Sequence, residues 1–184
     1  MTSAKSNRTP LPLALEILLD DHREVEALFD QYEDQREDNN ESRLGTAMQI
    51  CKQLTLHAQV EEELFYPWLR KALPESRKGL IEEAVAEHAD ARKLVARIAA
   101  LTSVDDASDA MVKALSEEIA HHVKEEEGKI FPEVLDRGDA LDELGQRLAA
   151  RKVELLEEVG LPLPGNGKQP PPEAESAARR RSAR

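Results

Sequence analysis

One motif, a histidine followed four residues later by a glutamate, occurs twice in this chain and constrains its fold more than any other feature. The first copy is His57 with Glu61, the second is His122 with Glu126, and a proline follows ten residues after each histidine. On an α-helix, residues i and i+4 share one face, so each imidazole points the same way as its carboxylate. Because proline removes a backbone hydrogen bond, we expect each helix to bend or end just beyond its polar pair.

A solitary histidine precedes each copy of the motif at almost the same distance. His22 lies 35 residues before His57, and His88 lies 34 residues before His122. The chain is therefore two copies of one pattern, and each half-repeat is expected to supply two helices.

Apolar residues recur at alternating steps of three and four along four stretches of the chain, with a histidine near the middle of each. Such a stripe is typical of the inward face of a bundle helix. The four stripes are Leu15, Leu18, His22, Val25, Phe29 and Tyr32; Ala47, Ile50, Leu54, His57, Glu61, Leu64 and Trp68; Ile81, Ala84, His88, Ala91, Val95 and Ile98; and Met111, Leu115, Ile119, His122, Glu126 and Ile130. We predict an all-α, up-and-down antiparallel four-helix bundle with its histidines at one level of the core.

The boundaries of this bundle follow from changes in composition along the chain. We expect a disordered N-terminus at residues 1–9 and the bundle at 10–136. A leucine-rich stripe predicts an additional C-terminal helix over 139–159 that packs outside the histidine layer. Residues 160–184 are rich in proline, alanine and arginine with little to bury, which predicts a disordered tail.

The net charge and the cysteine content limit the classes of binding partner and the cellular compartment that we expect for this chain. The net charge of −12 opposes binding to nucleic acid and to anionic membranes, because both require a positive field. Cys51 is the only cysteine, so neither an intramolecular disulfide nor a thiolate metal cluster can form. No run of eighteen apolar residues and no signal-peptide core is present. We expect a soluble, cytoplasmic protein.

Four imidazoles and two carboxylates at one level of an apolar core need partners. Burying an unsatisfied polar group costs about 1–3 kcal/mol, and a lone charge costs more. A metal would satisfy all six groups, and a ligand set without thiolate suits iron, manganese or zinc. Two carboxylates from opposite helices can bridge two cations, which favours a dinuclear site.

Several other residues leave alternatives open. His121 is adjacent to His122 and would point about 100° away around the helix, which gives it either ligation or an outer role. Cys51 is a candidate redox sensor or an inert buried thiol. Four glutamates are alternative ligands or members of an acidic solvated face: Glu62, Glu63, Glu125 and Glu127.

At these residues the chain resembles the hemerythrin-like, or HHE cation-binding, family over about residues 11–136. The resemblance rests on the segments DDH at His22, HAQVEEELFYP at His57, AEH at His88 and HHVKEEEGKIFP at His122. It implies a non-haem di-iron centre in which two Fe ions are linked by an oxo or hydroxo group. By this resemblance the terminal ligands are His22, His57, His88 and His122, and the bridging carboxylates are Glu61 and Glu126.

The chain departs from the oxygen-carrying members of that family by one imidazole. Those members have a His-x3-His pair on the third helix, whereas the positions four away from His88 are Ala84 and Arg92. An open coordination position favours a protein that binds O2, NO or peroxide, for sensing, scavenging or carriage. Two alternatives stand beside it: a di-iron oxidoreductase of the peroxide-decomposing or ferroxidase type, and a metal-independent helical interaction module.

Overall fold

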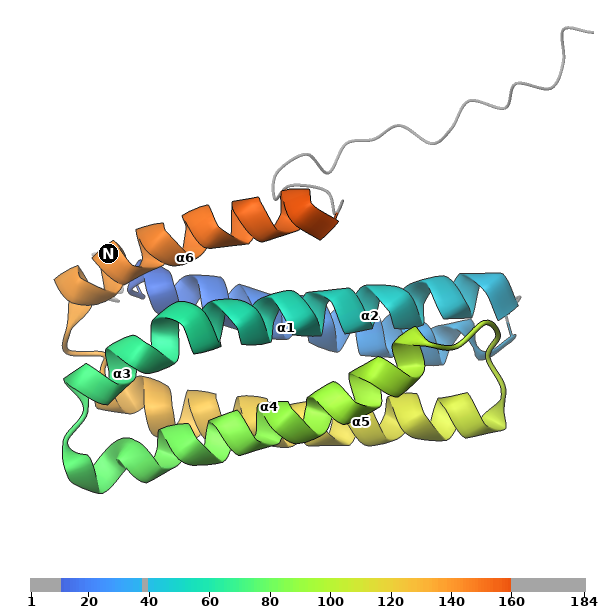
Figure 1. Cartoon of the computed structure of the whole chain (residues 1–184), viewed down its shortest axis with the longest axis horizontal. Coiled ribbons are helices and arrows are strands. Elements are labelled where there is room, and N and C mark those ends of the chain that lie inside the picture. Colours follow the sequence, from blue (N-terminus) through green and yellow to red (C-terminus); the bar gives the residue numbers. More distant parts are fainter. Residues whose placement is uncertain (1–10, 38–39, 160–184) are drawn as a thin grey trace, which may run out of the picture.

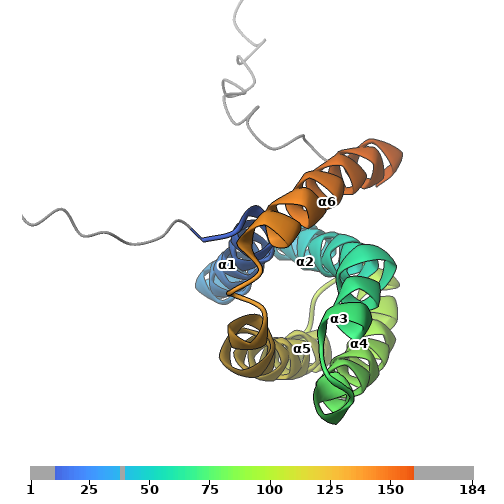
Figure 2. The ribbon, with the colours of Figure 1, turned by 90° about the vertical axis from the view of Figure 1, so that its left-hand side faces the viewer.

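The computed structural model describes residues 11–37 and 40–159, and within them the chain is all-α (Figure 1). Four long helices pack antiparallel around a common core, α3 extends α2, and α6 lies outside the bundle against α1 and α2 (Figures 1 and 2). The helices are α1 (Leu13–Asp34), α2 (Asn40–Val60), α3 (Tyr66–Ala72), α4 (Lys78–Ala99), α5 (Asp106–Glu125) and α6 (Gly138–Val159), with 3-10 turns at Gln35–Glu37, Glu75–Arg77 and Phe131–Glu133.

The predicted antiparallel bundle with an additional C-terminal helix is thus confirmed. The segments for which disorder was predicted, 1–9 and 160–184, lie outside the described residues. Among the residues that are described, no helix is long and apolar enough to cross a membrane.

The apolar core is divided into two clusters by the histidine layer. One cluster includes Leu15, Leu18, Phe65 and Ile81 and fills the end of the bundle that α3 and α6 cover. The other is built on Phe29, Tyr32, Ile50, Ile98 and Leu115, at the opposite end of the helices. The four histidine positions lie between the two clusters on every helix, so the polar layer is enclosed by hydrophobic side chains on both sides.

Each motif glutamate begins a turn of π-helix, at Glu61–Phe65 and at Glu126–Ile130. The N–H of Tyr66 donates to the carbonyl of Glu61, and the N–H of Phe131 donates to that of Glu126. Such a turn inserts one extra residue and rotates the helix that follows. The helix was expected to bend or end beyond the polar pair, at the proline, but the irregularity begins at the glutamate itself.

Because of this rotation, the second predicted stripe is wrong for the residues that follow Glu61. Phe65 and Leu69 are fully buried, whereas the predicted Leu64 and Trp68 are only half-buried. Constant three- and four-residue steps cannot anticipate an inserted residue, which moves every later inward position by one.

Helix α6 is docked closely on the start of α1. The N–H of Leu13 donates a 2.8 Å hydrogen bond to Oδ1 of Asp142 and so satisfies a free donor at the first turn of α1. A Cβ atom at Gly145 would lie 2.6 Å from the backbone nitrogen of Ala14, so only glycine permits this approach. The buried face of α6 consists of Leu141, Leu144, Leu148, Leu155 and Leu156.

Candidate metal centre

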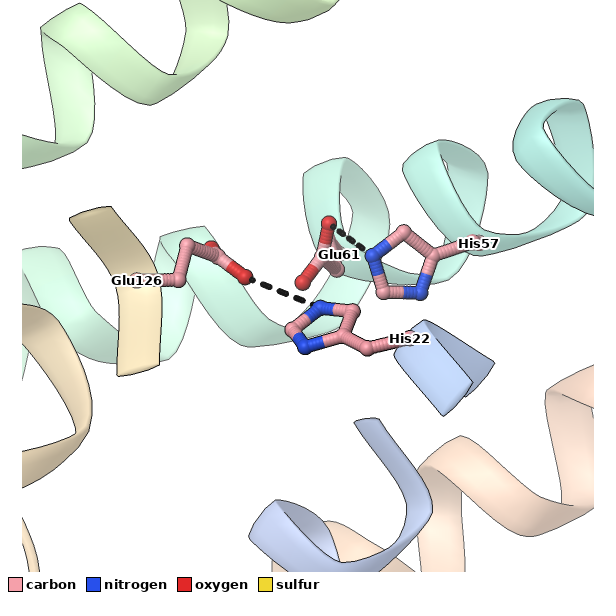
Figure 3. Close-up of side chains that lie close together, drawn as sticks. All are labelled: His22, His57, Glu61 and Glu126. Carbon is pink, nitrogen blue, oxygen red and sulfur yellow. Dashed lines mark ion pairs between the residues drawn. The ribbon is translucent and has the colours of Figure 1, made fainter. Parts of the chain in front are cut away.

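The structure brings together the histidines and glutamates of the two motifs in the interior. All six side chains from the two half-repeats are buried: His22, His57, His88, His122, Glu61 and Glu126. Figure 3 shows four of them pointing toward one another, with Nε2 of His57 3.1 Å from Oε2 of Glu61 and Nε2 of His22 3.5 Å from Oε2 of Glu126.

The six side chains form two groups that share Glu61. The potential donor atoms of His22, His57, Glu61 and Glu126 all lie within 4.8 Å of one another, and so do those of Glu61, His88 and His122. Oε2 of Glu61 is also 3.3 Å from Nε2 of His88. The arrangement therefore places two groups of potential metal ligands next to each other, and the carboxylate of Glu61 belongs to both.

The outward nitrogen of every one of these imidazoles faces a carboxylate. Nδ1 of His22 lies 3.0 Å from Glu127, that of His57 3.4 Å from Asp21, that of His88 3.0 Å from Glu62 and that of His122 2.9 Å from Glu87. Each of these acids comes from a different helix than the histidine it contacts, so the four contacts close a ring around the bundle. We name Asp21, Glu62, Glu87 and Glu127 the carboxylate ring.

The carboxylate ring determines which ring nitrogen of each imidazole is free to bind a cation. An ionised carboxylate only accepts hydrogen bonds, so a neutral imidazole that faces it carries its proton on Nδ1 and keeps a lone pair on Nε2. All four Nε2 atoms face the interior carboxylates Glu61 and Glu126. Metal-binding histidines in proteins are oriented by the same kind of contact.

The sequence analysis did not identify this ring. Glu62 and Glu127 were interpreted as alternative ligands or a solvated acidic face, and Asp21 and Glu87 were given no role. The signal was present in the repeat, because each half-repeat contains an acid directly before its solitary histidine and a second glutamate directly after its motif glutamate. The other two glutamates point elsewhere: Glu63 pairs with Arg151, and Glu125 pairs with Lys129.

Each acid of the carboxylate ring also contacts a cationic or titratable side chain on its outer side. Arg23 contacts Glu127 at 3.0 Å, Arg92 contacts Glu62 at 2.6 Å, His121 contacts Glu87 at 3.4 Å, and Lys152 of α6 pairs with Asp21. His121, considered above as an additional ligand, therefore lies outside the buried group. Its side chain is 62% exposed, as the 100° offset from His122 requires.

Tyr66 is a further polar residue of the site that the sequence analysis missed. Its hydroxyl donates a 2.9 Å hydrogen bond to Oε1 of Glu126 and lies 3.4 Å from both Oε2 of Glu61 and Nε2 of His88. The π-turn at Glu61 brings this residue inward. Phe131 occupies the equivalent position of the second half-repeat, so the hydroxyl breaks the symmetry of the site.

Burial and the charges of neighbouring side chains shift the pKa values of the buried glutamates and histidines in different directions. Burial, reinforced by the charge of Glu126, raises the pKa of Glu61 well above its usual value. Burial acts in the same direction on Glu126, but the nearby imidazoles of His22 and His122 outweigh it and lower its pKa to about 2. Burial, with the charge of His122, lowers the pKa of His88 to about 4, and burial also lowers that of His57. These two imidazoles are therefore neutral at pH 7.

The unsatisfied atoms of the site fit a cation. Within the described part of the chain, Nε2 of His22, Nε2 of His57, Oε1 of Glu61 and Oε2 of Glu126 are buried without a hydrogen-bond partner. Such atoms each cost about 1–3 kcal/mol unless something binds them. The donors are imidazole nitrogens and carboxylate oxygens, which suit iron, manganese or zinc.

A small cavity of about 30 Å³ adjoins the same imidazoles. Its walls include all four histidines and three further polar residues, Asp21, Thr55 and Arg92. The remaining lining side chains are apolar, among them Val25, Leu54, Ala91, Val95 and Ile119. One water requires about 10–15 Å³ on this kind of measure, so the cavity accommodates a molecule of a few atoms.

A helical bundle that buries facing imidazoles and carboxylates in this way has the donor set of a metal site. The family model of the hemerythrin HHE cation binding domain matches residues 13–134, and the chain belongs to this family. Helix α6 follows the matched residues.

The chain is also similar to a protein named DNA nickase from Nostoc sp. (strain PCC 7120 / SAG 25.82 / UTEX 2576). The two are 25% identical over 150 residues, which are 80% of this chain and 41% of the relative. The chain thus spans less than half of the length of that relative. No solved structure matches the chain.

Proposed function

We propose that this chain is a non-haem di-iron protein that binds O2, NO or peroxide at an open coordination position, for sensing, scavenging or carriage. The observation that carries the proposal is the position of the two interior carboxylates. Oε2 of Glu61 lies 3.1 Å from His57 and 3.3 Å from His88, and Oε2 of Glu126 lies 3.5 Å from His22 and 3.8 Å from His122. Each carboxylate thus reaches a histidine of both half-repeats, as a bridge between two cations must.

In this proposal the six buried side chains hold the irons, with four terminal imidazoles and with Glu61 and Glu126 as bridges. Iron supplies a redox-active cation with a position for a small ligand. The group of Glu61, His88 and His122 offers fewer donors than the other group, so we assign the open position to it. The adjoining cavity is small and mainly apolar, which selects a diatomic molecule or peroxide and excludes larger substrates.

A second candidate, a di-iron oxidoreductase that acts on peroxide, is favoured by Tyr66. Its hydroxyl contacts Glu126 and lies beside Glu61 and His88, so it can donate a hydrogen bond or a proton at the open position. The metal-independent interaction module is the weaker alternative, because it would leave the buried Nε2 and carboxylate atoms unsatisfied.

Although the Nostoc relative is named a DNA nickase, we do not propose that this chain acts on DNA. The net charge of −12 opposes contact with phosphates, and most of that relative lies outside the shared region.

The buried thiol of Cys51 suits a reducing compartment, so we place the protein in the cytoplasm.

Titration of the reduced, iron-loaded protein with NO, O2 and peroxide, followed by optical spectroscopy, tests the proposal. We expect charge-transfer bands that change with each ligand in the wild type and in Glu125→Gln, a control next to the site. Glu61→Ala and Glu126→Ala should lose the bands. An iron-loaded wild type whose spectrum responds to none of the three ligands would contradict the proposal, and sustained oxygen evolution from peroxide would favour the second candidate.

A further inference from the structure

Helix α6 reaches the metal centre through a chain of two polar contacts. The ammonium group of Lys152 pairs with Oδ1 of Asp21, and Oδ2 of the same carboxylate lies 3.4 Å from Nδ1 of His57. One oxygen of Asp21 thus faces the accessory helix while the other faces an imidazole of the buried site.

The Lys152–Asp21 pair is better shielded from water than the other outer contacts of the carboxylate ring. The side chains of Lys152 and Asp21 are 17% and 7% exposed. The outer side chains at the other three positions, Arg23, Arg92 and His121, are 57%, 50% and 62% exposed. Exposed ion pairs contribute little because water and salt screen them, whereas a shielded pair holds its geometry more firmly.

The contact also distinguishes the two half-repeats. In the second half-repeat the equivalent acid, Glu87, holds His122 and is contacted by His121 from the same bundle. In the first half-repeat the outer cation comes from α6, which lies beyond the residues matched by the family model. The accessory helix therefore acts on one of the two groups of donors, the one that contains His57.

We propose that Lys152 is a positioning residue that acts through Asp21 to hold the imidazole of His57, so that α6 controls how the cation position at His22 and His57 retains its metal. The inference rests on the proposed function and deepens it. The position at His88 and His122 is held by bundle residues alone and does not depend on α6.

Lys152→Met tests this inference, because methionine replaces the ammonium group with an uncharged side chain of similar length. Arg147→Met is the matched control, since it removes one positive charge from an exposed position of the same helix. Lys152→Arg keeps the charge and serves as the rescue variant. Lys152→Gln, which keeps a hydrogen-bond donor, replaces Lys152→Met if that variant does not fold.

The first readout uses metal-free protein and the ring 15N chemical shifts of its histidines. We expect Lys152→Met to move the signals of His57 and to leave those of His88 in place. Arg147→Met should move neither. Unchanged His57 signals in Lys152→Met would overturn the inference, and this result does not require the protein to bind iron.

The second readout is the release of iron from loaded protein to a ferrous chelator. Loss of the ammonium group frees Asp21, the partner of His57, and removing such a partner lowers metal affinity by about 10- to 100-fold. We therefore expect half of the iron in Lys152→Met to leave roughly tenfold faster than in the wild type. The other half should leave at the wild-type rate, and Lys152→Arg should restore the slow phase. Equal acceleration of both halves, or no acceleration, would overturn the inference. A wild type that holds no iron would instead refute the proposed function.

Discussion

The phenol of Tyr66 donates a 2.9 Å hydrogen bond to Glu126, so a residue of the first half-repeat holds the interior carboxylate of the second. Both side chains are fully buried. Burial and the two nearby carboxylates raise the pKa of Tyr66 well above its usual value, so the hydroxyl stays protonated and remains a donor. Phe131, at the equivalent position, gives Glu61 no such partner.

Replacement of Tyr66 by phenylalanine should therefore destabilise the metal-free protein. The substitution leaves Oε1 of Glu126 buried without its donor, which costs about 1–3 kcal/mol of the free energy of unfolding. Urea denaturation of metal-free wild type and Tyr66→Phe measures this difference. Equal midpoints and slopes for the two proteins would show that the hydrogen bond does not stabilise the fold.

Neutralising one acid of the carboxylate ring should weaken metal binding without removing a ligand. Glu127 holds Nδ1 of His22, whereas Glu125, on the other side of Glu126, pairs with Lys129. We expect Glu127→Gln to lower metal affinity by about 10- to 100-fold and Glu125→Gln to leave it nearly unchanged. Competition with a chelator measures both affinities. Similar affinities for the two variants would exclude an orienting role for Glu127.

The stability of the metal-free protein should fall in mild acid because of His88. The pKa of His88 is lowered to about 4 in the folded chain, mainly by burial, whereas the unfolded value is about 6.5. Below pH 6.5 the unfolded chain takes up this proton first, so the folded state loses roughly 3 kcal/mol as the pH falls toward 4. Urea titrations from pH 7 to 4 should show a shallower decline for His88→Gln, and a slope identical to that of the wild type would contradict this assignment.

Acid should also release the metal. Imidazoles must be neutral to bind a cation, so protonation of the histidines competes with metal binding. We therefore expect loaded protein to lose its metal as the pH falls below about 6.5, the ordinary pKa of an imidazole. Metal analysis after dialysis at stepped pH values measures the release.

The close docking of α6 predicts opposite effects of alanine at two helical glycines. A Cβ atom at Gly145 would lie 2.6 Å from the backbone nitrogen of Ala14, so Gly145→Ala should cost about 1–3 kcal/mol by overpacking. Gly45, within α2, has open space around its Cα, so Gly45→Ala should stabilise the helix by about 0.5–1 kcal/mol. Thermal denaturation compares the two, and a stabilising Gly145→Ala would contradict the docking.

The sequence alone predicted the fold and the convergence of six buried side chains, because both follow from helical geometry. The i, i+4 spacing aligns His57 with Glu61, and the repeat places the same pair on an opposing helix. The metal-binding roles of these residues stay a prediction.

Contacts that depend on neighbouring helices were not predictable in this way. Which acid faces a given Nδ1, such as Asp21 for His57, depends on how helices pair. The inward position of Tyr66 depends on a π-turn, which adds a residue that no regular period contains. The contact of Lys152 depends on where α6 docks.

Iron content per chain, measured on purified protein that was produced with iron and desalted, tests the central claim most directly. The arrangement of six donors around two cation positions predicts two irons per chain. Iron well below one per chain, despite an adequate supply during production, would contradict the assignment of a di-iron centre.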